Sequence, residues 1–486
     1  MGIEHDMENG DSRLSLEELR VPLTGHSKDE STGEEEAASG KRSKECRWML
    51  YLSTFVAVCG SFEFGACMGY SSPTQSAIRK ELNLSLAEYS LFGSILTFGA
   101  MIGAIMSGLI ADLIGRKGAM RISAIFCIAG WLPIYFAKGA LSLDIGRMSL
   151  GYGMGIFSYV VPVFIAEIAP KDLRGGLTSV NMVMVCCGIS IYFIIGTVLT
   201  WRTLALVGLV PCLILLLGLF FIPESPRWLA KMGHQKDFVA ALQQLRGKDV
   251  DISEEAADIV DYVETIQKLP KAKMVDLFQR RYLRSLIIAV GLMLFQQLGG
   301  ITGVSFYVSE VFVTAGFSAD VGTVSYAILQ VIVTILCAIL MDKAGRRLLL
   351  LVSASGQVIG SILVGTSFYL TVQELAPTVA PLLAVIGMMV YIGSFSSGMG
   401  VTPWVIMSEI FPINVKGTAG SLATLMNWIG AWAVSYSFNF LMSWSSYGTF
   451  SIFAAVNVIA ILFVAKLVPE TKGRTLEQIQ AAINTA

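Results

Sequence analysis

Charged residues are scarce in this sequence. Asp, Glu, Lys and Arg make up 15% of its 486 residues, whereas 54% of the residues are hydrophobic. Soluble domains carry about a quarter charged residues, so this chain cannot cover a folded surface with polar groups in water. An excess of one charge is also lacking, since the formal net charge is −1, and nucleic acid is not an expected partner. The partner we expect is a lipid bilayer.

Histidine and a disulfide framework are lacking as well. The three histidines lie outside the apolar segments and form no cluster with metal-ligand spacing, so we expect no metal, no cofactor and no enzymatic activity. Residues 1–47 contain no apolar core of a signal peptide, so the first apolar helix should direct membrane insertion. Most cysteines lie within apolar segments, where we interpret them as packing residues: Cys59, Cys67, Cys127, Cys186, Cys187, Cys212 and Cys337.

Long apolar runs without charge dominate the chain. Residues 90–111, 204–222, 285–309 and 321–341 each approach the ~20 residues that a helix needs to cross hydrocarbon. Cutting the chain at charges and helix breakers predicts an all-α membrane protein with twelve such helices, six in each half. The expected helices are 48–70, 89–111, 119–137, 142–166, 177–200, 203–222, 285–309, 321–341, 348–370, 381–407, 418–441 and 447–466.

The polar segments divide the chain into regions. We expect an acidic tail (1–47), a first bundle (48–222), a polar helical linker (223–284), a second bundle (285–466) and a short tail (467–486). Lys and Arg gather before the first helix and after the second, fourth and eighth, and basic loops remain in the cytosol. Both tails and the linker should therefore be cytosolic.

An internal repeat relates the two halves. Asp112-x-x-Gly-Arg116 after the second helix has a counterpart in Asp342-x-x-Gly-Arg346 after the eighth. The motif that runs from Glu167 to Arg174 after the fourth helix recurs from Glu409 to Lys416 after the tenth, and Pro-Glu224-Ser after the sixth recurs as Pro-Glu470-Thr after the twelfth. Three matches in the same order indicate a duplicated six-helix unit, the arrangement of major facilitator transporters.

The repeated charges have two interpretations. Retention of basic loops in the cytosol explains the Arg and Lys residues by themselves, but acids contribute little to topology, so their repetition needs another cause. An Arg fork at a helix end can hold carboxylates from two helices. We therefore predict a cytosolic gate, with ion pairs between the halves that break when this side opens. Its residues are Asp112, Arg116, Glu167, Arg174, Glu224, Asp342, Arg346, Glu409 and Lys416.

Further motifs resemble a known family. Residues 223–229 (PESPRWL), 296–300 (QQLGG), 403–404 (PW) and 469–473 (PETKG) resemble the sugar porters of the major facilitator superfamily. Residues 69–73, 89–94 and 404–412 are similar to the plant early-responsive-to-dehydration-like monosaccharide transporters. That resemblance implies a location in the vacuolar membrane. The dileucine-like sorting signal of the N-terminal tail has Pro22 in place of its first leucine, so the plasma membrane is the alternative location.

The resemblance also implies a sugar site. A sugar needs amides for its hydroxyls and an aromatic plane for its C–H face. Gln296, Gln297, Trp404 and Asn427 match sugar-contacting positions of the family, and Gln330 takes the place of a further amide. The alternatives are interhelical hydrogen bonds for a lone amide such as Gln330, and a place at the membrane interface for the tryptophan.

Two positions depart from the family pattern. Thr302 stands where the family has an Asn, and Met182, beside Asn181, stands where it has a Gln. Each lost amide removes a hydrogen bond that contributes roughly 0.5–1.5 kcal/mol net. We expect weaker binding, or a less hydroxylated substrate.

The first helix departs in a way that bears on energy coupling. Proton-coupled members carry an Asp at the position of Cys67, whereas the Arg that usually pairs with it is retained as Arg147. A thiol does not cycle a proton as a carboxylate does, so a uniporter is expected. Glu63 lies one helical turn before Cys67 and is either a structural carboxyl group or, if coupling persists, the proton site.

The sequence thus predicts a monosaccharide transporter. A hexose such as glucose or fructose would cross by alternating access, most simply by facilitated diffusion. Proton-coupled sugar export from the vacuole is the alternative, in which protons are a second partner, and a sugar receptor that does not transport is a third interpretation. We expect the protein to be a monomer.

Overall fold

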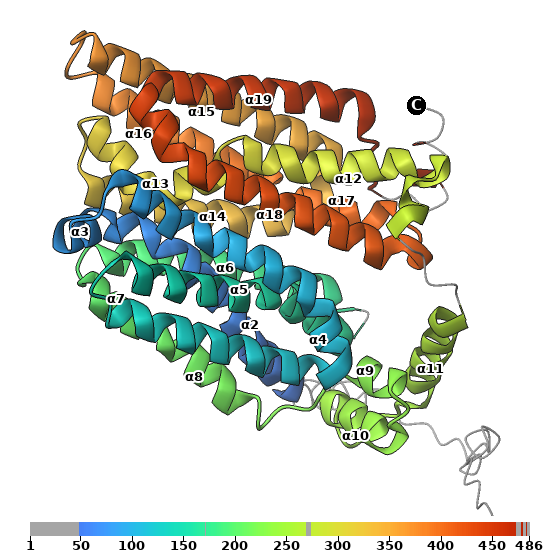
Figure 1. Ribbon diagram of the computed structural model, residues 1–486. Helices are drawn as coiled ribbons and strands as arrows, with labels where there is room; N and C mark the ends of the chain where they lie inside the picture. Colours follow the sequence, from blue (N-terminus) through green and yellow to red (C-terminus); the bar gives the residue numbers. More distant parts are fainter. Residues whose placement is uncertain (1–47, 171, 269–273, 473–477, 480–482, 484–486) are drawn as a thin grey trace, which may run out of the picture.

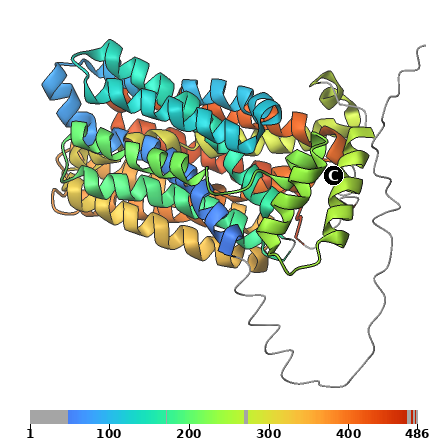
Figure 2. The same cartoon turned by 90° about the horizontal axis from the view of Figure 1, so that it is seen from below.

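A computed structural model describes the chain except for residues 1–47, 171, 269–273, 473–477, 480–482 and 484–486. All regular structure in the described part is helical (Figure 1). The helices run along a common long axis, with the N-terminal half beside the C-terminal half. The short linker helices lie beyond one end of this bundle, as the view from below also shows (Figure 2).

The N-terminal half consists of seven helices as the structure divides them. They are α2 (Trp48–Gly69), α3 (Ser71–Leu82), α4 (Leu86–Tyr135), α5 (Ala140–Ile168), α6 (Arg174–Gly196), α7 (Trp201–Val207) and α8 (Leu209–Gly218). The long α4 changes direction at Gly115, whose φ of 83° favours glycine. It therefore contains two of the expected spans, one on each side of this bend.

The linker and the C-terminal half follow. The linker helices are α9 (Pro226–Lys231), α10 (Gln235–Arg246) and α11 (Ser253–Lys268). The C-terminal half has η2 (Met274–Phe278), α12 (Arg280–Leu298), α13 (Ile301–Thr314), α14 (Ala319–Ala344), α15 (Arg346–Val372), α16 (Ala380–Ser394), the π-helical turn η3 (Phe395–Met399), α17 (Thr402–Ile410), α18 (Ile413–Trp444) and α19 (Ser446–Leu467).

Ten helical segments of the described chain are long and apolar enough to cross a membrane. One of them is α4, which the bend at Gly115 divides, and α18 lies in the bundle without belonging to the ten. With these two additions the structure accounts for the twelve expected helices. The all-helical fold with two halves is the one predicted from the sequence.

Small residues allow the bundle helices to approach closely. A Cβ atom added to Gly103 of α4 would clash with the carbonyl oxygen of Tyr152, and one added to Gly151 of α5 would clash with that of Leu96. Because lipid tails are as apolar as the side chains, helix packing in a membrane depends on such close van der Waals contact. An alanine at either position would force α4 and α5 apart.

Candidate functional site

Two adjacent glutamines and one asparagine meet between α12 and α18. Asn427 Nδ2 donates to Gln296 Oε1 (2.8 Å), and Gln297 Nε2 donates to Asn427 Oδ1 (3.4 Å). Gln296 and Asn427 are buried, with 4% exposure each, whereas Gln297 is half-buried. We call these three residues the amide cluster. Gln297, the half-buried residue of this cluster, retains hydrogen-bond donor and acceptor capacity for a ligand.

The π-helical turn η3 completes the inner side of this cluster. Gln296 Nε2 donates to the carbonyl oxygens of Met399 (2.6 Å) and Gly400 (2.9 Å). A π-turn interrupts the regular helical ladder and so frees carbonyl groups, which is why such turns recur at functional sites. The wide turn thereby fixes the orientation of the Gln296 amide.

A second break brings Thr302 to the amide cluster. Between α12 and α13 the chain turns at Gly300, whose φ of 104° is strained for other residues. After this turn, Thr302 Oγ1 donates to Gln297 Oε1 (2.5 Å). The threonine thus bonds to the neighbouring amide, so that a hydroxyl helps to orient Gln297.

The other predicted sugar contacts lie apart from these bonds. Trp404 is half-buried and packs against the apolar cluster that includes Met293 and Met399. Gln330 is buried, and its Oε1 has no hydrogen-bond partner in the described chain. Met182 is half-buried, and no described hydrogen bond links it or Gln330 to the amide cluster.

The two halves touch along the end of the bundle opposite the linker. We call the two ends of the bundle the linker end and the far end. At the far end, the hydroxyls of Ser72 and Ser309 are 2.9 Å apart, and the backbone N–H of Ser309 also donates to Ser72 Oγ (2.9 Å). Asn439 Nδ2 donates to Ser90 Oγ (3.0 Å) between α18 and α4. The far end is closed by direct polar contacts.

Contacts between the halves continue as far as the level of the amide cluster. Ser190 Oγ donates to the carbonyl oxygen of Ala327 (3.0 Å), and the rings of Phe64 and Trp428 approach to 6.1 Å. Trp428 follows Asn427 directly, and its buried indole N–H has no partner in the described chain. Our sequence reasoning missed this tryptophan, although its position next to Asn427 was a usable signal.

Beyond that level, towards the linker end, the described ion pairs stay within one half. Arg116 binds Glu167 in a bidentate fashion, with Nε to Oε2 and Nη2 to Oε1 both at 2.8 Å. In the C-terminal half, Arg346 Nη2 lies 3.5 Å from Glu409 Oε1. In this conformation both arginines bind carboxylates of their own bundle, because the motifs fold as local helix-end clusters. Ion pairs between the halves in another conformation stay a prediction.

The remaining gate residues take varied positions. Arg174 Nη2 donates to the carbonyl oxygen of Ala169 (3.4 Å), and neither Arg174 nor Lys416 forms an ion pair in the described chain. Asp112 pairs with Arg116 (3.3 Å) and with Lys231 of the linker (2.8 Å). The side chain of Asp342 lies outside the described part.

The two repeated glutamates after the sixth and twelfth spans cap helix starts. Glu224 accepts from the backbone N–H of Arg116 (3.2 Å) and Lys117 (3.1 Å), and Glu470 accepts from that of Arg346 (2.9 Å) and Arg347 (3.1 Å). Burial raises the pKa of Glu224 above its ordinary value against the effect of its backbone hydrogen bonds. Burial acts on Glu470 in the same direction, but there the backbone donors prevail and lower its pKa.

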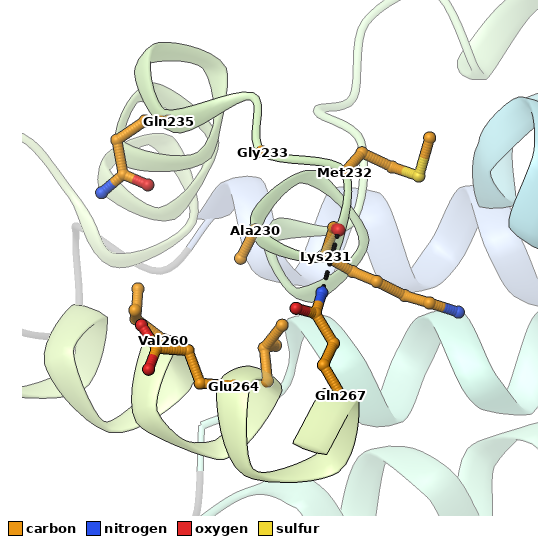
Figure 3. A pocket seen from close by; sticks show the side chains of 9 residues that line it. Ala230, Lys231, Met232, Gly233, Gln235, Val260, Glu264 and Gln267 are labelled. Atoms are coloured by element: carbon orange, nitrogen blue, oxygen red, sulfur yellow. Dashed lines mark hydrogen bonds between the residues drawn. The ribbon is translucent and has the colours of Figure 1, made fainter. Parts of the chain in front are cut away.

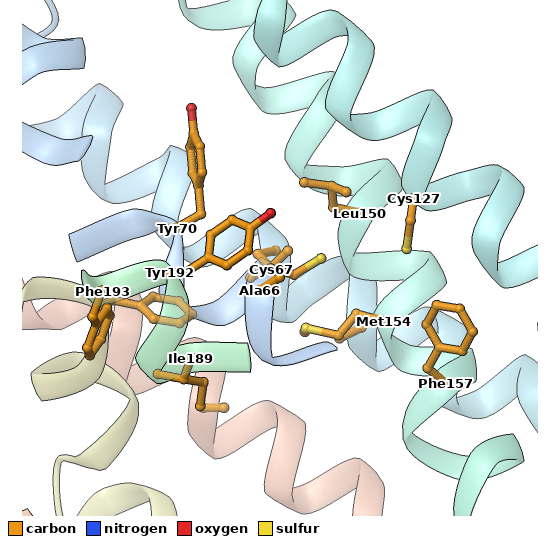
Figure 4. Close-up of a cluster of buried hydrophobic side chains, with 14 of the residues drawn as sticks. Ala66, Cys67, Tyr70, Cys127, Leu150, Met154, Phe157, Ile189, Tyr192 and Phe193 are labelled. Atoms are coloured by element: carbon orange, nitrogen blue, oxygen red, sulfur yellow. The ribbon is translucent and has the colours of Figure 1, made fainter. Parts of the chain in front are cut away.

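A buried carboxyl group lies on α2, the first helix of the N-terminal half. Glu63 is fully buried; its Oε1 accepts from Trp131 Nε1 (2.6 Å) and Cys67 Sγ (3.5 Å), and its Oε2 has no partner in the described chain. Figure 4 shows Cys67 of α2 and Tyr70, which follows that helix, in one buried cluster with Cys127, Leu150 and Tyr192. Glu63, Cys67 and Cys127 form the sole described set with three potential metal-ligand atoms close together, within 4.8 Å of one another.

Arg147 does not face a carboxylate. Its Nη1 donates to the carbonyl oxygen of Cys67 (2.8 Å) and its Nη2 to Ser71 Oγ, while its guanidinium lies over the ring of Phe92 (4.7 Å). No described ion pair joins it to Glu63. Neutral oxygens and an aromatic face thus hold a fully buried cation.

Comparison with known proteins shows the family of the chain. Residues 34–483 match the family described as "Sugar (and other) transporter". The chain is 67% identical to Sugar transporter ERD6-like 7 of Arabidopsis thaliana over 437 residues, covering 90% of this chain and 94% of that protein. It is 59% identical to Sugar transporter ERD6-like 16 of the same plant over 479 residues, 98% of each chain.

Solved structures show the same fold. The proton:xylose symporter XylE bound to 6-bromo-6-deoxy-D-glucose is 27% identical, with a TM-score of 0.73 over 90% of this chain and 99% of that one. The inward-open conformation of XylE from E. coli gives a TM-score of 0.74 at 28% identity over 89% and 99%. Fold and site thus define a transporter of the major facilitator superfamily. Within that class, the chain belongs to the sugar transporter family, and it resembles the plant ERD6-like members.

Proposed function

We propose that the protein carries a monosaccharide, a hexose such as glucose or fructose, across a membrane by facilitated diffusion. The observation that carries this proposal is the amide cluster of Gln296, Gln297 and Asn427 between α12 and α18. Amides supply both donors and acceptors to sugar hydroxyls. Trp404 and Trp428 are the aromatic planes near the same helices that would cover the C–H face of the ring.

Alternating access explains the uneven contacts between the halves. In this conformation the far end is closed by the bond between Ser72 and Ser309, whereas the described ion pairs of the linker end lie within each half. Rocking of the halves would open the far end and join the linker end. The Lys and Arg residues near the linker end support a cytosolic location for this end. The vacuolar membrane is the proposed location, with the plasma membrane as the alternative.

Facilitated diffusion follows from the surroundings of Cys67. A proton-coupled carrier needs a group that gains and loses a proton during the cycle, and the position of the family's carboxylate holds a thiol here. Arg147 donates to the Cys67 carbonyl and to Ser71, and no described carboxylate pairs with it in this state. The binding cycle can then run without a change of protonation.

Sugar uptake into proteoliposomes tests the proposal. Entry of labelled hexose should equilibrate its concentration without a proton gradient and should not change the internal pH. Pentoses and polyols at equal concentration define the substrate class. Absence of saturable uptake for all of these sugars, in vesicles shown to contain folded protein, would overturn the proposed function.

Proton coupling through Glu63 is the second candidate. A carboxyl group that is buried without a cation, with Oε2 unpartnered, is costly when charged and is therefore suited to hold a proton. In a coupled carrier, Glu63→Gln would abolish the pH dependence of uptake and the acidification or alkalinisation of the vesicle interior. In a uniporter, the Glu63→Gln variant and the wild type should give superimposable pH profiles, which is the outcome we expect.

A further inference from the structure

A small polar cavity lies at the far end between the two halves. Its volume is about 160 Å³, and its walls come from the start of α3, the end of α6, α13 and the start of α14. Ser72 and Gln75 line it from the N-terminal half, and Ser309, Glu310 and Asp320 line it from the C-terminal half. The bond between Ser72 and Ser309, which closes the far end, thus forms part of its wall. The sugar site near Asn427 is a separate feature.

The lining of this far-end cavity contains polar groups without partners. Gln75 is 3% exposed, and neither its Nε2 nor its Oε1 has a hydrogen-bond partner in the described chain. A buried amide that is left unpaired destabilises the fold, so such a group calls for a ligand. Glu310 is half-buried, Asp320 is exposed, and the described residues provide no ion pair to either carboxylate.

Basic side chains lie close by but do not neutralise these acids. Arg79 follows Gln75 by one turn of α3, and Lys80 comes next. Neither forms an ion pair with Glu310 or Asp320 among the contacts of the described chain. Two carboxylates therefore face a cavity whose other walls offer hydroxyl and amide oxygens.

We infer that the far-end cavity binds a hard divalent cation, with Ca²⁺ as the probe. Carboxylate, amide and hydroxyl oxygens are the ligands that Ca²⁺ takes in sets of about 6–8, often with water among them. Since a water molecule occupies about 30 Å³ of liquid, a cavity of 160 Å³ has room for a partly hydrated ion. Glu310 and Asp320 supply the negative charge, and Gln75 Oε1 supplies a neutral ligand.

Binding would hold the two halves together. Gln75 belongs to one half and both carboxylates to the other, so a shared ion links them next to the Ser72–Ser309 contact. The ion then favours the conformation that is closed at the far end. Sugar entry from that side needs the open conformation, so the bound ion should slow it. This effect on transport rests on the proposed alternating access, whereas cation binding itself does not.

The first test therefore measures binding without sugar. Purified full-length protein is heated in detergent with 10 mM Ca²⁺ or with K⁺ at equal ionic strength. We expect Ca²⁺ to raise the apparent Tm of the wild type and of Glu374→Gln, a matched control at an exposed far-end position. The shift should vanish in the Glu310→Gln/Asp320→Asn double variant and shrink in Gln75→Leu, which leaves the charge unchanged. The inference is overturned if Ca²⁺ has no greater effect than K⁺, or if the double variant keeps the full shift.

The second test measures sugar entry from the far side of proteoliposomes. For a site with a Kd of about 1 mM, 10 mM Ca²⁺ on that side should slow entry about tenfold in the wild type. The double variant should be insensitive, and Glu374→Gln should respond as the wild type does. Equal slowing in the double variant would show that the ion acts elsewhere and would refute the cavity as its site. If no sugar enters under any condition, the proposed function fails, while the melting experiment still decides the cation site.

Discussion

The two halves of the molecule repeat the same helix-end motif with different tightness. In the N-terminal half, the Arg116–Glu167 pair is bidentate at 2.8 Å, with side-chain exposures of 7% and 14%. In the C-terminal half, the Arg346–Glu409 pair has one contact at 3.5 Å, with exposures of 13% and 28%. Among the described contacts, the Arg–Glu pair of this motif is thus tight in one half and loose in the other.

The linker explains part of this difference. Lys231 binds Asp112, the Trp228 indole N–H donates to the Asp112 carbonyl (3.0 Å), and Arg246 donates to the Ile168 carbonyl (2.9 Å). These contacts tie the linker to the N-terminal half. A cavity of about 350 Å³ lies between α9 and α11, which a hydrogen bond from Gln267 Nε2 to the Lys231 carbonyl oxygen (3.3 Å) also joins (Figure 3). The described contacts of the linker thus strengthen the helix-end cluster of the N-terminal half.

The largest expected effect comes from breaking the tight pair. Glu167→Gln leaves the buried Arg116 with only the longer pair to the exposed Asp112 and should cost about 3 kcal/mol of stability, because a buried charge that loses its bidentate partner is expensive. Glu409→Gln breaks the looser, more exposed pair and should cost about 1 kcal/mol or less. Apparent Tm values of the two variants in detergent measure the difference. Equal losses would contradict the distinction between a tight and a loose half.

Transport sharpens the same comparison. If the helix-end clusters also govern closure of the linker end, Glu167→Gln and Arg174→Gln should lower the turnover number more than they change KM. The helix-end charges lie away from the amide cluster, so ligand affinity has no direct reason to change. Initial rates of hexose uptake over a range of concentrations separate the two parameters. Unchanged turnover in both variants would remove the gate from the mechanism.

A second contrast concerns the amides. The C-terminal half carries the amide cluster, whereas Asn181 of the N-terminal half accepts a hydrogen bond from Ser61 (2.6 Å) and is buried. Asn427→Ala should therefore raise KM for hexose by roughly 5- to 100-fold, the equivalent of about 1–3 kcal/mol of lost polar contacts. Asn181→Ala is the matched control, which should lower stability with little change in KM. A larger KM effect of Asn181→Ala would place the sugar nearer to the N-terminal half.

The sequence was sufficient for the fold because hydropathy and motif spacing act locally. Each apolar run and each repeated Asp-x-x-Gly-Arg motif reflects one helix or one helix end, and the described chain has ten helical segments long and apolar enough to cross a membrane. The partners of Arg116 and Arg346 were harder to predict, since spacing shows which groups share an end of the bundle and not which half supplies the carboxylate. Trp428 was missed for a similar reason: its role depends on Phe64, which is distant in sequence.

The smallest expected effect is the opposite pH response of the two capping glutamates. Burial raises the pKa of Glu224 in the folded state, so the folded protein binds its proton more tightly, and this group contributes stability at low pH that is lost as the pH rises through its folded pKa. The pKa of Glu470 is lowered despite burial, so its contribution is present above the ordinary Glu value and is lost as the pH falls through the folded pKa. Melting curves between pH 4 and 7 test this difference. As the pH rises, the wild type should lose the stability that Glu224 contributes, and Glu224→Gln should not show this loss. As the pH falls, the wild type should lose the stability that Glu470 contributes, and Glu470→Gln should not show that loss. Parallel profiles for the two variants would mean that the halves do not differ in this respect.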